Sequence, residues 1–394
     1  MIIDYICPNC GKRGISIFYE LKNVPVHSAL LLPTREEALG YPKGNIALGF
    51  CNACGFIANV AFDPSLHEYS SRYEPTQSFS ATFNSFHRKL ATHLITQYNL
   101  YNKSIIEIGC GQGEFLILLC ELGSNRGFGF DPAYHNGRKD KKQMNDRFTI
   151  IKDFYSENYA DYKGDFVCCK MTLEHIQQTA SFVSSIRRSI GNLSDTAVFF
   201  QVPNVRRILQ DLAFWDIYYE HCSYFSLGSL ARLFRKCSFD VIELWKDYDE
   251  QYLMIATKPT NREHGSNLAQ ENDITELTRD VSYFSKKYQQ KLNTWKRNLQ
   301  GIKQTGKKAV IWGAGSKGVA FLTTLKIQDE IEYVVDINPY KQGTYMAGTG
   351  HEIVAPEFLQ AYRPDFVVVM NPVYYKEIQQ YLDQIGVTAD VITV

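Results

Sequence analysis

The sequence of 394 residues has no excess of charge of either sign, since 42 Lys and Arg balance 42 Asp and Glu. Tight binding to nucleic acid depends on neutralising phosphates, so a chain without basic excess is a poor candidate for that function. No apolar run approaches the roughly 18 residues of a transmembrane helix, and Met1–Tyr5 does not begin a signal peptide. We therefore expect a cytoplasmic protein that binds a small molecule and neither nucleic acid nor membrane.

Cysteine is also sparse for a disulfide scaffold, because ten residues are spread over the whole chain. Four of them nevertheless form two Cys-x-x-Cys pairs, Cys7/Cys10 and Cys51/Cys54. Two such pairs supply the four thiolates that tetrahedral zinc requires, and a site closed by four cysteines has no open position for catalysis. The sequence predicts a structural zinc site in residues 1–75, a segment that otherwise reads as loop-rich. The alternative is a chance spacing of small buried thiols.

The remaining chain divides by its hydrophobic patterns. Residues 76–258 alternate apolar, strand-like runs with helical patterns, which is typical of a parallel sheet covered by helices. Residues 306–394 repeat this α/β plan. Between them, residues 259–305 hold a polar linker and a stripe of apolar residues at steps of three and four, from Ile274 to Ile302. This long helix either packs on a neighbouring domain or forms a dimer seam, so both a monomer and a homodimer are compatible with the sequence.

A glycine-rich turn follows the apolar run over residues 104–108 and precedes a helical pattern. Its glycines alternate with other residues and are Gly109, Gly111 and Gly113. Glycine lets the backbone approach a ligand, and the helix N-terminus favours a polar or anionic group. Asp131 ends the next strand, at a spacing that suits a carboxylate bound to ribose hydroxyls. Asp153 and Phe154 follow a further apolar run and can contact an adenine edge.

This pattern, which begins at Glu107, resembles class I S-adenosylmethionine-dependent methyltransferases. A nicotinamide-binding turn more often has Gly-x-Gly-x-x-Gly, and Gly113 comes one residue too early for that spacing. The sequence therefore predicts an α/β, Rossmann-like methyltransferase domain that holds S-adenosylmethionine through the residues of this pattern. The alternative is a glycine turn that serves only the packing of helix on strand.

Two Glu-His pairs occur in the same domain. Glu174-His175 follows the expected fourth strand, and Glu220-His221 lies in an aromatic stretch over residues 214–226. Adjacent residues cannot share a helix face, so we expect Glu220 and His221 on a loop. A lone histidine is more often a structural hydrogen-bonding group, but two such pairs in one cofactor-binding domain favour a catalytic role.

The order of these motifs resembles the sugar C-methyltransferase family. The shared features are the four-cysteine module, Tyr69–Ser71, the glycine turn, Leu173–Ile176 and Tyr218–Ser226, followed by the C-terminal segments Gly313–Gly318, Tyr333–Pro339 and Lys341–Gly343. The resemblance covers nearly the whole chain. It implies a zinc-binding module over 1–75, a class I methyltransferase domain over 76–258, a linker and long helix over 259–305, and a C-terminal Rossmann-like α/β domain over 306–394.

The resemblance also implies an activity: S-adenosylmethionine-dependent C-methylation of a keto-sugar, attached to a nucleotide, in sugar or natural-product biosynthesis. Methylation next to a carbonyl requires removal of an α-proton, and the resulting enolate attacks the sulfonium methyl group. In the family's arrangement, His221 is the leading base and Glu220 supports it. The enolate would be oriented or stabilised by Tyr218, His175 and a tyrosine of the Tyr69–Tyr73 segment, with Tyr69 as our choice.

Two departures from the family leave the substrate open. Asn23–Leu32 replaces a segment that packs near the family's substrate, and Met370–Pro372 stands where the family tends to have Trp-Asn. The turn Gly313–Gly318 is itself a full Gly-x-Gly-x-x-Gly, with Asp336 at the distance expected for NAD. By resemblance this domain instead closes over the substrate's nucleotide. An O- or N-methyltransferase, an NAD-dependent oxidoreductase and an assembly protein with a vestigial cofactor site therefore remain alternatives.

Overall fold

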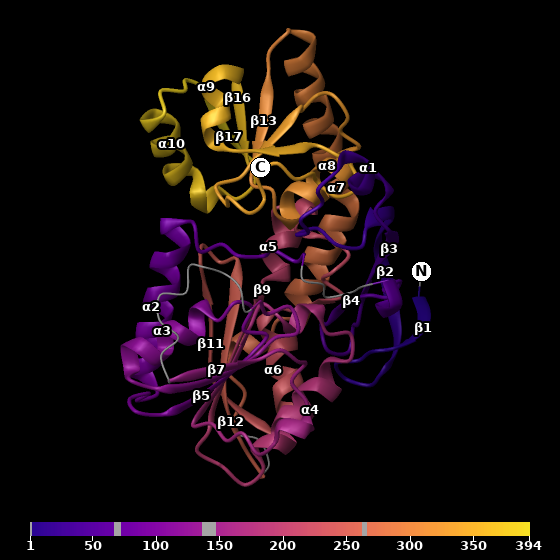
Figure 1. Ribbon diagram of the computed structural model, residues 1–394. Helices are drawn as coiled ribbons and strands as arrows, with labels where there is room; N and C mark the ends of the chain where they lie inside the picture. The colour runs from indigo at the N-terminus through magenta and orange to yellow at the C-terminus, as the bar shows by residue number, and fades with distance from the viewer. Residues whose placement is uncertain (1, 67–71, 136–146, 262–265) are drawn as a thin grey trace.

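The computed structural model describes residues 2–66, 72–135, 147–261 and 266–394. The described residues form three sheets, of five, seven and five strands. Figure 1 shows the C-terminal sheet at the top, the seven-stranded sheet below it, and the N-terminal strands at the right. Among these residues, no helix combines the length and apolar character needed to cross a membrane.

The first sheet is antiparallel and corrects our expectation that residues 1–75 are loop-rich. Its strands, in spatial order, are β1 (Ile2–Ile6), β2 (Arg13–Pro25), β3 (Lys43–Phe50), β4 (Ile57–Asn59) and β10 (Ser223–Tyr224). Ile15 and Tyr19 of β2 are buried, as the two-residue period of a half-buried strand requires. The last strand comes from the segment that carries the second Glu-His pair. The cysteine module and this segment are therefore parts of one sheet.

The central sheet confirms the class I methyltransferase fold. Its strands, in spatial order, are β11 (Phe239–Asp247), β12 (Tyr252–Pro259), β9 (Ala197–Pro203), β8 (Phe166–Lys170), β5 (Ser104–Ile108), β6 (Arg126–Phe130) and β7 (Phe148–Ile151). The pairs from β9 to β7 are parallel, and β12 runs antiparallel to both of its neighbours. The apolar run predicted over residues 104–108 is strand β5.

Helices cover both faces of this sheet. One face packs against α2 (Ala81–Gln97) and α3 (Glu114–Gly123), and the other packs against α4 (Thr179–Ile190) and α6 (Leu227–Lys236). Apolar side chains alternate between the two cores, as in β5, where Ile105 and Ile106 point to opposite faces. The sheet therefore rigidly positions the loops at its carboxyl edge, where ligands of open α/β sheets bind.

The C-terminal sheet is parallel throughout. Its strands, in spatial order, are β15 (Glu352–Val354), β14 (Tyr333–Val335), β13 (Ala309–Trp312), β16 (Phe366–Val369) and β17 (Asp390–Thr393), and its helices are α8 (Ser316–Leu325), α9 (Leu359–Tyr362) and α10 (Tyr375–Gln384). In chain order this is 3-2-1-4-5, which matches the first five strands of the doubly wound order 3-2-1-4-5-6.

The long predicted helix is α7 (Ile274–Gln304). Its buried residues are Leu277, Val281, Phe284, Leu292, Trp295 and Leu299, and they share one apolar core with residues of β2, α5 (Val205–Gln210) and α8. The apolar stripe packs within the chain, in agreement with a connecting helix. A short helix, α1 (Arg35–Gly40), completes the N-terminal part.

Candidate active site and cysteine centre

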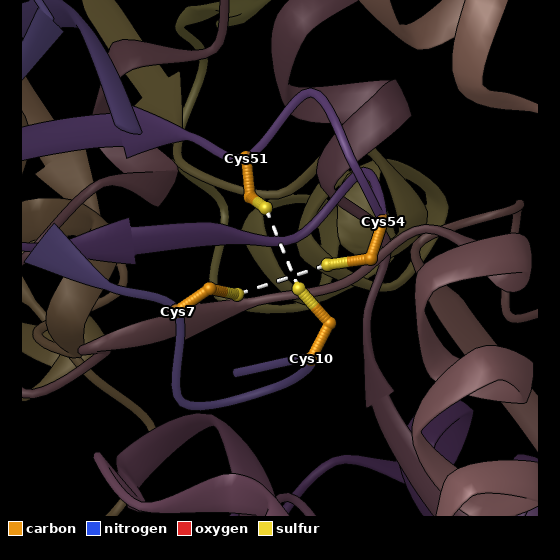
Figure 2. Close-up of side chains that lie close together, drawn as sticks. All are labelled: Cys7, Cys10, Cys51 and Cys54. Carbon is orange, nitrogen blue, oxygen red and sulfur yellow. Dashed lines mark hydrogen bonds between the residues drawn. The ribbon is translucent and has the colours of Figure 1, made fainter. Parts of the chain in front are cut away.

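The four predicted zinc ligands converge on one point (Figure 2). The Sγ atoms of Cys7 and Cys54 are 3.7 Å apart, as are those of Cys10 and Cys51. All four Sγ atoms lie within 4.8 Å of one another. Zinc–thiolate bonds of about 2.3 Å in a tetrahedron place sulfur atoms about 3.8 Å apart. The cluster therefore fits a structural zinc ion, and none of its residues lines the large cavity described next.

A cavity of about 600 Å³ lies where the central sheet faces the C-terminal domain. Six of the seven predicted cofactor residues line it, namely Glu107, Gly109, Gly111, Asp131, Asp153 and Phe154. Gly113 lies behind them at the start of α3, with a positive φ of 86°. The same cavity is lined by residues 174, 175, 218 and 221 and by the C-terminal turn around residues 313–317. The tertiary structure thus brings all three predicted motif regions to one space.

The glycine turn has a conformation that other residues would disturb. Gly109 has a φ of 68°, and a Cβ atom there would lie 2.0 Å from Oγ1 of Thr172. The carboxylate of Asp131 accepts the backbone N–H groups of Gly111 and Ala133, each at 2.8 Å. These bonds hold the turn against the end of β6. A carboxylate has about four lone-pair directions, so two remain for hydroxyl groups of a ligand.

Asp153 and Phe154 line the cavity and are exposed. The Asp153 carboxylate accepts the Phe154 N–H at 2.7 Å and the hydroxyl of Tyr159. The Phe154 ring is 59% exposed and lines the cavity.

The two histidines of the Glu-His pairs come together. His175 ends the 3₁₀ turn Leu173–His175, and its ring centroid is 4.9 Å from that of His221. The ring of Tyr218 lies 4.2 Å from His221 on another side. Nδ1 of His221 is buried without a hydrogen-bond partner among the described residues. Burial, helped by the nearby His175 and Lys317, holds the pKa of His221 well below its ordinary value, so the imidazole is neutral and can accept a proton.

Glu220 lies differently from our expectation that it supports His221. Its carboxylate is bonded to Nδ1 of His27 at 2.8 Å and to the hydroxyl of Ser28, and it does not line the large cavity. Burial opposes ionisation, but the bonds and charges, above all from His27, lower the pKa of Glu220. The segment that departs from the family, Asn23–Leu32, therefore supplies the partners of Glu220, and any support for His221 is indirect. The unusual sequence of Asn23–Leu32 is the one feature that could have indicated its contact with Glu220.

Glu174 is a site residue that sequence reasoning did not select. It is 1% exposed, lines the cavity, and neither carboxyl oxygen has a hydrogen-bond partner among the described residues. Burial raises the pKa of Glu174 to about 8, so at neutral pH the group is mostly protonated and can donate a hydrogen bond. Its oxygen lies within 4.8 Å of the ring nitrogens of His175 and His221. These three groups can therefore contact the same part of a bound molecule.

Tyr69 lies in residues 67–71, outside the described part of the chain. Tyr73, the other tyrosine of the Tyr69–Tyr73 segment, lines the cavity.

The C-terminal turn repeats the geometry of the glycine turn. Asp336 accepts the N–H groups of Ala314 at 2.9 Å and Asn338 at 2.8 Å, as Asp131 does in the central domain. Here, however, Nζ of Lys341 also contacts the carboxylate at 3.3 Å. This second aspartate is therefore already paired with a cation.

Two contacts join the C-terminal turn to other parts of the chain. Nζ of Lys317 donates to Asp216 at 2.6 Å. The hydroxyl of Ser28, which donates to Glu220, lies at hydrogen-bonding distance, 2.7 Å, from that of Ser316.

The sheet order, the cofactor turn and the neighbouring histidines define a class I methyltransferase. In agreement, the family described as "Methyltransferase domain" matches residues 81–244, and the "C-methyltransferase C-terminal domain" matches residues 254–390. C-methyltransferase NovU of Streptomyces niveus is 26% identical over 393 residues, which cover 94% of this chain and 90% of NovU. The chain is an S-adenosylmethionine-dependent methyltransferase. The two family models and the similarity to NovU support the C-methyltransferase family that its motifs resemble.

Similar solved structures correspond to less than half of the chain. The PH0226 protein of Pyrococcus horikoshii is 15% identical and covers 47% of this chain and 94% of its own, with a TM-score of 0.36. A putative S-adenosylmethionine-dependent methyltransferase of Listeria monocytogenes is 12% identical and covers 45% and 100%, with a TM-score of 0.35. The 1,6-didemethyltoxoflavin N1-methyltransferase of Burkholderia thailandensis, with bound S-adenosylhomocysteine, is 12% identical and covers 44% and 79%, with a TM-score of 0.34.

Proposed function

We propose that this enzyme methylates a carbon next to the carbonyl group of a keto-sugar, and that the sugar is attached to a nucleotide. The carrying observation is that one cavity joins the cofactor turn, a buried neutral histidine with an unpartnered nitrogen, and the phosphate-binding type of turn in the C-terminal domain. The family match to C-methyltransferases supports carbon as the methyl acceptor. Such an enzyme belongs to sugar or natural-product biosynthesis.

The cofactor residues would be the predicted set: Glu107, Gly109, Gly111, Gly113, Asp131, Asp153 and Phe154. Bound S-adenosylmethionine supplies an electrophilic methyl group. The two free lone pairs of Asp131 suit the ribose hydroxyls, and the exposed Phe154 ring suits the adenine. In this assignment the nucleoside end of the cofactor would lie against Asp131 and Phe154.

We assign the proton transfer to His221 and the residues around it. His221 would take the α-proton, because its imidazole is neutral and its Nδ1 has no hydrogen-bond partner in the part of the chain that the structure describes. Burial, with nearby acidic groups, holds the pKa of Tyr218 well above its ordinary value, so its hydroxyl remains a donor for the oxygen of the enolate. His175 and protonated Glu174 would contact the same oxygen or its neighbours. Donors aimed at a developing oxyanion are typically worth about 3–4 kcal/mol each.

The C-terminal domain would hold the nucleotide of the substrate. Its turn ends at the N-terminus of α8, where backbone N–H groups favour phosphate, and Lys317 and Lys341 line the same part of the cavity. NAD is disfavoured there because Asp336, which would accept its ribose hydroxyls, already contacts Lys341. The four cysteines would bind a structural zinc ion, and the division at residues 75, 258 and 305 remains our proposal for the domain boundaries.

The direct experiment incubates the enzyme and S-adenosylmethionine with a panel of nucleotide-linked keto-sugars. We expect mass spectrometry to show the gain of one methyl group with at least one of them, and loss of deuterium from a substrate labelled at the α-carbon. Methylation that retains the α-deuterium would instead indicate an O- or N-methyltransferase. The same sugars without nucleotide serve as the control for the role of the C-terminal domain.

The choice of cofactor domain can be tested with two matched aspartates. We expect Asp131→Ala to weaken S-adenosylhomocysteine binding roughly 10- to 100-fold, because the turn loses its anchor and the ligand loses a charged acceptor. Asp336→Ala removes the equivalent carboxylate from the other domain and should leave this affinity within about 3-fold of wild type. Isothermal titration calorimetry measures both. The reverse pattern would mean that the C-terminal turn is the cofactor site.

A further inference from the structure

A buried lysine in the cofactor cavity makes no close ion pair with a carboxylate of the described residues. Lys170, the last residue of β8, is 8% exposed and lines the cavity. Its ammonium group lies 3.1 Å from Nε2 of His87 and 3.5 Å from the centroid of the Phe115 ring. No carboxylate among the described residues lies within 4.0 Å of it. Burial of an ammonium group is costly unless a negative charge pairs with it.

Glu107 lies beside this lysine. Strands β5 and β8 are parallel, and Glu107 is opposite Cys168, so Lys170 is two residues further along on the same face. Glu107 is 2% exposed, and its Oε2 has no hydrogen-bond partner among the described residues. Both side chains line the cavity next to the glycine turn. A cation and a hydrogen-bond acceptor are thus buried side by side, both open to the ligand space.

The groups around Lys170 and Glu107 leave the ammonium and the carboxylate able to bind a ligand. Burial lowers the pKa of His87 to about 2, so this histidine is neutral and its Nε2 accepts one of the three ammonium hydrogens of Lys170. Two hydrogens remain for an anion. The Phe115 ring supports the cation through its face but supplies no countercharge. Buried polar groups in folded proteins are normally satisfied, so the ligand itself is expected to complete this cluster.

A ligand that satisfies both groups carries a carboxylate and an ammonium on neighbouring atoms, which describes an α-amino acid. We propose that Lys170, oriented by His87, binds the α-carboxylate of S-adenosylmethionine, and that Glu107 accepts a hydrogen bond from its α-ammonium group. Asp131 and Asp153 are at the nucleoside end, so the cavity recognises the cofactor at both of its ends. This inference depends on the cofactor and not on the identity of the methyl acceptor.

Three ligands separate the two charges. S-adenosylmethionine carries both groups, decarboxylated S-adenosylmethionine carries only the ammonium, and 5′-methylthioadenosine carries neither. For Lys170→Met we expect calorimetry on the full chain to show S-adenosylmethionine binding weakened roughly 10- to 100-fold, with the other two ligands changed by less than about 3-fold. For Glu107→Gln we expect weaker binding of the first two ligands and unchanged binding of 5′-methylthioadenosine.

Two further variants guard against a merely structural effect. Lys170→Arg keeps the charge and should keep the preference for S-adenosylmethionine over its decarboxylated form. Lys163→Met changes an exposed lysine outside the cavity and should bind all three ligands as the wild type does. The proposal is overturned if Lys170→Met weakens all three ligands equally or none of them. It is equally overturned if the wild type does not prefer S-adenosylmethionine to the decarboxylated form, whatever the sugar assays show.

Discussion

The His221→Ala variant is expected to methylate roughly 10²- to 10⁴-fold more slowly than the wild type, which is the range that a positioned general base contributes. The physical reason is that His221 is buried, that its lowered pKa keeps the imidazole neutral, and that its Nδ1 has no hydrogen-bond partner among the described residues. The loss should fall on proton removal itself. Exchange of the substrate α-proton with deuterated solvent, followed by NMR in the presence of S-adenosylhomocysteine, should therefore slow by a similar factor.

His93→Ala is the matched control, because His93 is exposed on α2 and lies outside the cavity. We also expect His175→Ala to retain more α-proton exchange than His221→Ala, since a residue that only stabilises the enolate does not carry the proton. Exchange at the wild-type rate in His221→Ala would show that another group is the base.

Burial of His221 determines the direction in which the acidic limb of the pH profile of kcat/KM is shifted. The folded-state pKa of His221 is lowered below its ordinary value of 6.5, so the neutral, active form persists to more acidic pH than for a solvated histidine. The acidic limb of the wild-type profile is therefore expected below pH 6.5, and it should be absent from the residual activity of His221→Ala.

The second large effect is expected from Cys51→Ser, which removes one thiolate from the four-cysteine cluster. A structural zinc site of this kind is worth about 10–16 kcal/mol of apparent binding free energy in small zinc modules at neutral pH, and that energy is also folding energy. We expect the variant to lose bound zinc and to unfold at a lower temperature. Elemental analysis and thermal unfolding followed by circular dichroism measure the two effects.

Loss of zinc should also lower activity, although the cluster does not line the cavity. The reason is that β10, directly after His221, pairs with β4 of the same sheet that holds Cys51 and Cys54. Cys237→Ser is the control, because Cys237 is buried but lies outside the cluster, and it should retain zinc. A Cys51→Ser variant with wild-type zinc content would remove the case for a metal site.

Several features of this enzyme could be read from local pattern. The glycine turn, the paired cysteines and the stripe of α7 each depend on residues a few positions apart, and short-range geometry translates such spacing directly into a turn, a metal knuckle or a helix face. The strands of the central sheet were likewise visible as apolar runs between turns. The class of enzyme followed from these features because the cofactor turn is itself a local structure.

The partners of the site residues could not be read in the same way. Glu220 bonds His27 across 193 residues of sequence, and Lys170 meets Glu107 only because two parallel strands pair in one register. The N-terminal sheet takes its last strand, β10, from another part of the chain. Such contacts arise from strand pairing, domain docking and burial, which no spacing in the sequence encodes. They decide which carboxylates are ionised and which nitrogen is available to a proton.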